Sequence, residues 1–159
     1  MNIGSGNGYP EGALSNFTPH PFIFDGIQCA SMEGLLQSFK FSNPDMQEHV
    51  CTLVGRKAKF KGKKKNWYDA QLLHWRGVEY PRDSDEYQKL LDRAFDALAT
   101  NAKFKKALLA SGDATLKHSI GKSKTNETIL TVREFCGRLT KIRTRLVGEI
   151  NVARFSLAP

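Results

Sequence analysis

The chain has 159 residues, of which 40% are apolar and 25% charged, and these values are typical of one globular domain over residues 1–159. Its 24 Lys and Arg residues outnumber 16 Asp and Glu residues, and the net charge of +8 favours a polyanionic partner, either nucleic acid, an acidic membrane or a phosphorylated metabolite. The sequence contains no apolar segment of membrane-spanning length and no signal-peptide pattern, so we expect a cytoplasmic protein that makes no use of a membrane.

The N-terminal third predicts loops and short strands over residues 1–30, followed by helices. Alternating apolar residues over 21–27 enclose Asp25-Gly26, a dipeptide typical of a hairpin turn. Ser31 is a candidate N-cap for a helix over about 32–41. A second helix is expected to begin at Asn43-Pro44, because proline at the first helical position gives up no hydrogen bond.

The C-terminal half carries two capping-box patterns ahead of apolar stripes with helical spacing, Asp83 with Glu86 and Thr131 with Glu134. Between them we expect a short helix near 102–110 that stops at Gly112, then a strand over 114–116. The sequence therefore predicts an α+β domain that is rich in helix and has a few short strands.

The cysteines Cys29, Cys51 and Cys136 are odd in number and lack the CxxC or His-paired spacing of a zinc site. We interpret them as reduced thiols of the core, and predict neither a metal nor a cofactor.

One helical segment brings together residue types that carry chemistry. Glu33, Gln37 and Lys40 stand at i, i+4 and i+7, which places a carboxylate, an amide and an amine on one helix face. The alternative is a solvated polar face on which Glu and Lys barely interact, and the spacing alone favours that alternative.

This segment also belongs to a longer pattern, formed by Leu14-Ser15-Asn16-Phe17, Pro21-Phe22, Asp25-Gly26 and Ser31-x-Glu33-x-x-x-Gln37-x-x-Lys40-Phe41. In order and spacing it resembles the opening motif of the NADAR (NAD- and ADP-ribose-associated, YbiA-like) family. Later blocks are similar but looser, namely Gly55-Arg56, Lys65-Asn66-Trp67, residues 108–112 and the closing helix to Arg143. The segment His118–Glu127 departs from the family pattern, which has an acidic residue and Trp-Gly-x-Gly there.

The resemblance implies a YbiA-like fold and cleavage of N-glycosidic bonds in nucleotide-like substrates. Some members are implied to remove ADP-ribose from guanine and so to oppose a DNA ADP-ribosyltransferase toxin, while others act on phosphorylated riboflavin precursors. The net charge favours ADP-ribosylated guanine in DNA or nucleotides. The two alternatives are a hydrolase of riboflavin precursors and a module that binds ADP-ribose or nucleic acid without turnover.

The resemblance also assigns catalytic roles. Glu33 would protonate the leaving base or the ring oxygen, and Lys40 would attack the opened sugar to form a Schiff base. Lys40 must then be neutral part of the time, which burial or neighbouring cations would achieve by lowering its pKa.

Further residues are candidates for substrate binding, and some of them have a structural alternative. Asn16 and Phe17 would hold and stack a ribose or base, or form a turn and a core contact. Trp67 and Trp75 compete to stack on the base, with a core role equally open for each. The other candidates are Gln37 as a hydrogen-bond donor, His118, Ser119 and Lys122 as a pyrophosphate cradle, and Glu127 as the replacement acidic residue.

Residues 56–65 form a basic run that contains Arg56 and six lysines. Such a run neutralises phosphates and would suit a DNA or RNA substrate. A solvated loop is the alternative.

Overall fold

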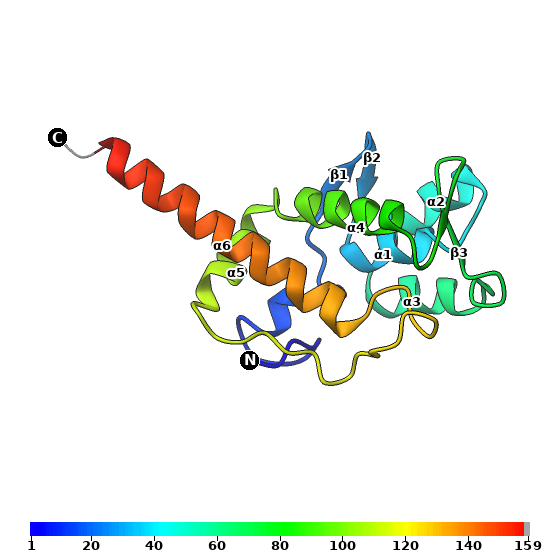
Figure 1. Cartoon of the computed structure of the whole chain (residues 1–159), viewed down its shortest axis with the longest axis horizontal. Helices are drawn as coiled ribbons and strands as arrows, with labels where there is room; N and C mark the ends of the chain where they lie inside the picture. Colours follow the sequence, from blue (N-terminus) through cyan, green and yellow to red (C-terminus); the bar gives the residue numbers. More distant parts are fainter. Residues whose placement is uncertain (158–159) are drawn as a thin grey trace.

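A computed structural model describes residues 1–157 and confirms an α+β fold of helices with two small antiparallel sheets (Figure 1). In chain order its elements are η1 (Gly12–Leu14), β1 (Phe22–Phe24), β2 (Ile27–Cys29), α1 (Met32–Ser38), α2 (Pro44–Cys51), α3 (Gly55–Lys63), β3 (Leu72–Trp75), β4 (Val78–Pro81), α4 (Asp85–Leu98), α5 (Ala102–Ala110) and α6 (Val132–Leu157).

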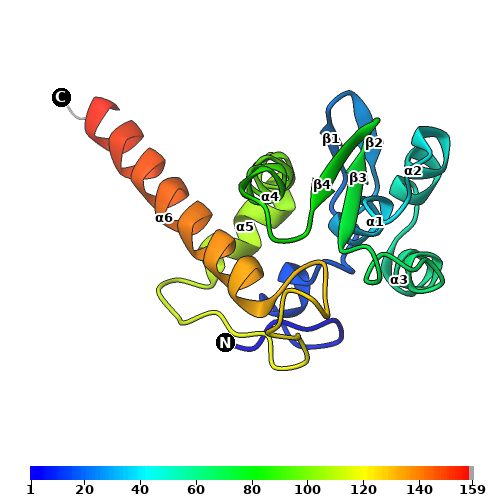
Figure 2. The same ribbon diagram turned by 45° about the vertical axis from the view of Figure 1, so that its right-hand side comes forward.

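The first hairpin, β1–β2, turns at Asp25 and Gly26 as predicted, and both residues have positive φ angles of 49° and 79°. The second hairpin, β3–β4, was not anticipated; its strands have four residues each, too few for a clear alternation. Figure 2 shows the two hairpins side by side, and Trp75 of β3 packs against Phe24 of β1 with 5.4 Å between ring centroids.

Helix α1 lies at the centre of the fold and is buried along its whole length. The Ser31 hydroxyl accepts a hydrogen bond from the Gly34 N–H at 3.1 Å, which confirms the predicted cap. A Cβ at Gly34 would lie only 2.6 Å from the Leu53 carbonyl oxygen, so glycine lets α1 approach the segment after α2. The helix ends at Ser38 rather than near 41, and Lys40 therefore follows it in a turn.

One of the two predicted capping boxes is confirmed, and the other lies one residue away from its predicted position. The box at α6 is confirmed, since the Thr131 hydroxyl accepts from the Glu134 N–H at 3.1 Å while Glu134 Oε1 accepts from the Thr131 N–H at 2.8 Å. The box at Asp83 was wrong by one residue: Ser84 caps α4 and accepts from the Tyr87 N–H at 3.1 Å.

Helix α3 contains residues 56–63 of the basic run, so the alternative of a solvated loop is wrong for that part of it. Lys64 and Lys65 follow the helix, and Gly62 packs closely against α1. The expected strand over 114–116 is absent from the described chain; instead Lys117 forms a single parallel bridge with Asn2. Residues 112–131 consequently form a long loop beside the N-terminal segment (Figure 1).

Helix α6 has a buried half and a projecting half. The buried half faces the core with Phe135, Leu139, Ile142 and Leu146, whereas residues 152–156 extend away from the body (Figures 1 and 2). Across residues 1–157, no helix combines the length and the apolar character needed to span a membrane. The three cysteines are buried and free, as predicted.

Candidate active site

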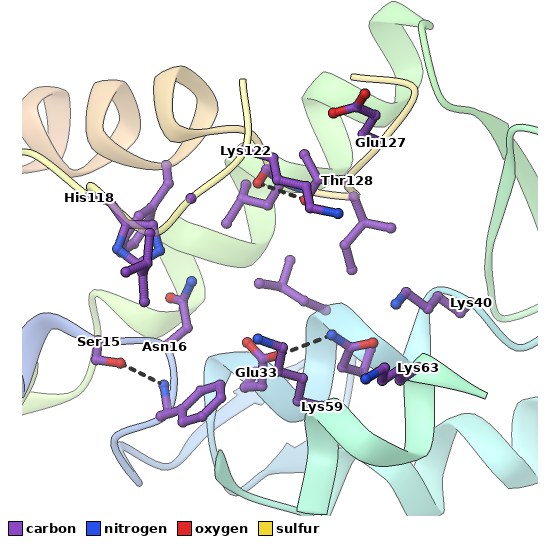
Figure 3. A pocket seen from close by; sticks show the side chains of 18 of the residues that line it. Ser15, Asn16, Glu33, Lys40, Lys59, Lys63, His118, Lys122, Glu127 and Thr128 are labelled. Atoms are coloured by element: carbon purple, nitrogen blue, oxygen red, sulfur yellow. Dashed lines mark hydrogen bonds between the residues drawn. The ribbon is translucent and has the colours of Figure 1, made fainter. Parts of the chain in front are cut away.

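A cavity of about 490 Å³ opens between α1, α3 and the loop 112–131 (Figure 3). The segment after η1 and the turn after α1 complete its walls. Its lining residues are Ser5, Ser15, Asn16, Phe17, Glu33, Leu36, Gln37, Lys40, Lys59, Lys63, Trp67, His118, Ile120, Gly121, Lys122, Glu127, Thr128, Ile129, Leu130 and Phe135.

Glu33 projects from the first turn of α1 into this cavity, although its side chain is largely shielded from solvent. Its N–H donates to the Asn16 carbonyl at 3.0 Å, and its Oε1 accepts from Gln37 Nε2 at 2.9 Å. Burial raises the pKa of Glu33, although the Gln37 hydrogen bond and the positive charges of Lys59 and Lys40 oppose this shift. A carboxyl in this environment holds a proton more readily than an exposed one.

Lys40 lies in the turn after α1, where its N–H donates to the Gln37 carbonyl at 3.1 Å. Burial lowers the pKa of Lys40 to about 8, with Lys59 and Lys122 adding to the shift and Glu33 opposing it. No ion pair between described residues joins Lys40 to Glu33. About a tenth of Lys40 is therefore neutral at pH 7, which is the form that can act as a nucleophile.

Two buried side-chain oxygens at this site, Asn16 Oδ1 and Gln37 Oε1, have no hydrogen-bond partner within residues 1–157. Buried polar atoms are almost always paired in native proteins, so an unpaired oxygen beside a cavity marks a place for a ligand donor. Gln37 Oε1 lies against Gly62 of α3, where any Cβ would overlap it. Asn16 Oδ1 is therefore the oxygen better placed to meet a ligand.

The roof of the cavity is the later part of the loop 112–131, and buried polar side chains fasten it. Arg82 Nε donates to the Thr128 carbonyl at 2.8 Å, and the Tyr87 hydroxyl donates to the Ile129 carbonyl at 2.7 Å. At the other end of the loop, His118 Nδ1 lies 2.8 Å from the Ile3 carbonyl oxygen. Hydrogen bonds from the protein core therefore fix the backbone that carries the lining side chains of the roof.

The structure brings nine of the predicted site residues to the cavity: Asn16, Phe17, Glu33, Gln37, Lys40, Trp67, His118, Lys122 and Glu127. It leaves Trp75 and Ser119 outside. Trp75 is a core residue that packs on Phe24 and Phe39 and donates its Nε1–H to Asp25 at 2.8 Å. Ser119 exchanges two hydrogen bonds with the Asn2 side chain and so anchors the N-terminus.

The sequence interpretation missed Lys59 and Lys63 as cavity residues, because it treated the whole basic run as one track. Once the run is a helix, their i, i+4 spacing places both on one face. It also missed Thr128 and its neighbours, which no motif distinguishes.

Comparison with known proteins identifies the family of this chain. Residues 8–144 match the sequence profile of the family described as bacteriophage protein GP30.3. The chain belongs to this family. It is 38% identical, over 149 residues, to a 17.1 kDa protein from the Gp30-rIII intergenic region of enterobacteria phage T4, and the match covers 92% of this chain and 98% of the phage T4 protein.

A solved structure shares the fold. The NMR structure of the E. coli protein YbiA matches with a TM-score of 0.61 at 16% identity, covering 94% of this chain and 85% of YbiA. The YbiA-like fold expected from the opening motif is thereby confirmed.

Proposed function

We propose that this protein is a hydrolase of N-glycosidic bonds, and that its substrate is ADP-ribose attached to guanine in DNA or nucleotides. One observation carries the proposal: a buried carboxyl of raised pKa, Glu33, and a partly buried amine of lowered pKa, Lys40, line the same cavity. Pairs of groups whose environments shift their pKa values in this way are typical of acid and base catalysis. The NADAR-type fold supports the same reaction class.

Glu33 supplies the proton that the departing base needs. Guanine leaves as an amine, so the C1″–N bond breaks readily only when that nitrogen is protonated. Because Gln37 Nε2 occupies one carboxylate oxygen, the other oxygen is free to face the substrate. The Gln37 amide thereby orients the acid.

Lys40 acts as the nucleophile on the opened sugar. The ring first opens as the proton of the guanine N–H passes to the ring oxygen, the C1″–O bond breaks and C1″ becomes double-bonded to the guanine nitrogen. The neutral Nζ then adds to C1″, and Glu33 and Nζ each give one proton to the guanine nitrogen. Guanine leaves with the electron pair of the C–N bond, and a protonated imine joins Lys40 to the sugar. Water then adds to C1″ and releases the Lys40 amine, so the products are the restored base and ADP-ribose. Overall one water is consumed, and no oxidant or reductant is required.

Other lining residues hold the substrate in this scheme. Asn16 Oδ1 accepts a hydrogen bond from a sugar hydroxyl, which would satisfy its unpaired buried oxygen. Phe17 is half-buried at the cavity wall and offers a ring on which a base can stack, with Trp67 nearby as a largely buried second aromatic. Glu127 and His118 remain candidate polar contacts on the roof.

A preference for DNA rests on the outer surface of α3 and the residues after it. Arg56, Lys64 and Lys65 are exposed there, and Lys64 Nζ lies 4.4 Å from the centre of the exposed Phe60 ring. Cations interleaved with an exposed aromatic ring suit a nucleic-acid strand that continues past the cavity. The biological counterpart would be a DNA ADP-ribosyltransferase toxin acting in the same cytoplasm.

A product assay with three substrates tests the proposal: ADP-ribosylated guanosine, ADP-ribosylated DNA and a phosphorylated riboflavin precursor. We expect release of ADP-ribose and unmodified guanine from the first two, measured by chromatography and mass spectrometry. Turnover of the riboflavin precursor alone would replace the substrate but keep the reaction class. Binding of ADP-ribose without turnover of any substrate would overturn the enzyme proposal.

A further inference from the structure

The cavity holds an excess of positive charge that the proposed chemistry does not use. Lys40, Lys59, Lys63 and Lys122 line it, against only two carboxylates, Glu33 and Glu127. Among residues 1–157, none of these lysines forms an ion pair. Like charges gathered without partners raise one another's energy, and an anion bound among them relieves that repulsion.

Helix α3 supplies two of these lysines on one face. Lys59 and Lys63 stand one turn apart, and Gly62 between them packs directly on the Gln37 side chain. Because Gly62 has no side chain, the helix approaches α1 closely and presents both lysines to the cavity, with Lys59 beside Glu33 (Figure 3). Lys59 also lies 5.9 Å from the centre of the Phe17 ring, at the wall where we expect stacking.

Lys122 comes from the opposite wall. It lies on the roof loop, where its carbonyl accepts a hydrogen bond from the Val132 N–H at 3.0 Å at the start of α6. Figure 3 shows Lys122 above the cavity and Lys59 and Lys63 below it. Three cations therefore border one volume from two separate elements of the chain.

We propose that Lys59, Lys63 and Lys122 form a subsite for a diphosphate group, which holds the substrate by its phosphates while Glu33 and Lys40 act on the glycosidic bond. The subsite rests on the proposed function only for the position of that bond. Lysine is a common point-charge ligand of phosphate, and a diphosphate diester brings two negative charges to a cavity with an excess of two cations.

The other face of α3 provides a built-in comparison. Lys57 and Lys61 have the same i, i+4 spacing on the same helix, but neither lines the cavity. The Lys59/Lys63 pair and the Lys57/Lys61 pair contribute equally to the net charge of the protein. A difference in anion binding between variants of the two pairs would therefore reflect position in the cavity and not net charge.

Titration with inorganic pyrophosphate by isothermal calorimetry tests the subsite. We expect the double variant Lys59→Gln with Lys63→Gln to bind pyrophosphate at least about tenfold more weakly than the parent protein. The matched control, Lys57→Gln with Lys61→Gln, should bind within about twofold of the parent, since long-range charge is largely screened at 0.15 M salt. Thermal unfolding checks that both variants fold, and glutamine preserves helix propensity.

Three results would overturn the subsite: no pyrophosphate binding by the parent protein, undiminished binding by the Lys59/Lys63 variant, or equal weakening in both variants. Pyrophosphate has no glycosidic bond, so these outcomes do not depend on turnover. If pyrophosphate binds as expected but none of the three glycoside substrates is cleaved, the subsite stands and the proposed reaction fails. If substrates are cleaved but pyrophosphate does not bind, the reverse holds.

Discussion

Two carboxylates in the first turns of helices, each accompanied by a cation, behave in opposite ways. Glu134 of α6 forms two hydrogen bonds with Arg82, the shorter of 2.6 Å, and accepts two more from Thr131 and Gln88. Burial raises the pKa of Glu134, but these bonds and the Arg82 charge outweigh it and lower the pKa overall. Among residues 1–157, the Gln37 amide is the only hydrogen-bond partner of the Glu33 side chain, and burial raises the pKa of Glu33.

The difference separates a structural pair from the pair that we propose to be catalytic. Arg82 and Glu134 saturate each other, so their charges are fixed and their role is to join β4, α4 and the roof loop to α6. Glu33 and Lys40 share a cavity without pairing, and each is shifted towards its neutral form. Burial therefore accompanies a fixed ion pair at Arg82 and Glu134, whereas at Glu33 and Lys40 it shifts both pKa values towards the neutral forms.

The largest expected effect is on covalent chemistry at Lys40. Borohydride reduction during turnover should fix an ADP-ribose-derived mass on Lys40, and Lys40→Arg should abolish both the adduct and turnover, because a guanidinium stays protonated. Peptide mass spectrometry identifies the modified residue. Lys40→Arg with substantial activity and no adduct in the parent protein would show that Lys40 acts only as a charge, as Arg82 does.

The second effect concerns the structural pair. Glu134→Gln leaves the buried Arg82 guanidinium without its counter-charge, so we expect the free energy of unfolding to fall by about 3 kcal/mol. Urea denaturation measures the change. Glu86→Gln, an exposed carboxylate in the first turn of α4, is the matched control and should change stability by less than about 0.5 kcal/mol.

Glu33→Gln should give the opposite result, a loss of turnover of at least about 100-fold without loss of stability. Because the pKa of Glu33 is raised, the folded state binds the Glu33 proton more tightly than the unfolded chain does. Ionisation of Glu33 therefore lowers the stability of the protein as pH rises from the pKa of the unfolded chain through the pKa of the folded state. A neutral amide removes that penalty. Steady-state kinetics and thermal unfolding are measured together, and a folded variant with near-normal turnover would remove Glu33 from the mechanism.

The smallest effect is in the pH profile. If a protonated Glu33 and a neutral Lys40 act together, kcat/KM should rise with pH up to the pKa of Glu33, because the neutral fraction of Lys40 grows. Between the two pKa values kcat/KM should reach a plateau, because Glu33 loses its proton as Lys40 does. Above about 8, where Lys40 is already neutral and only Glu33 continues to deprotonate, kcat/KM should decline. Measurement of kcat/KM on both sides of the Lys40 pKa of about 8 tests the decline. A profile without a decline near the Lys40 pKa would contradict it.

The sequence predicted local chemistry better than tertiary placement. The turn at Asp25-Gly26, the Ser31 cap and the Thr131 box are local hydrogen-bonding patterns, and all three formed as expected. Glu33, Gln37 and Lys40 were found because one short helix and its following turn carry them together.

Features that depend on distant segments were missed. Trp67 and Trp75 look alike in sequence, but only the position of the β3–β4 hairpin decides that Trp75 joins the core and Trp67 borders the cavity. The positions of Lys59 and Lys63 likewise depend on how closely α3 approaches α1. Gly62 permits this close approach, but no local sequence pattern predicts it.

The tethered roof has a consequence for affinity. A free loop of this length would have to be ordered by the ligand, at roughly 1–2 kcal/mol for each residue whose backbone becomes fixed. Here Arg82 and Tyr87, buried in the framework, already hold the carbonyls of Thr128 and Ile129. A ligand that enters beneath this stretch meets a preorganised wall, so its contacts there add to binding with little loss of chain entropy.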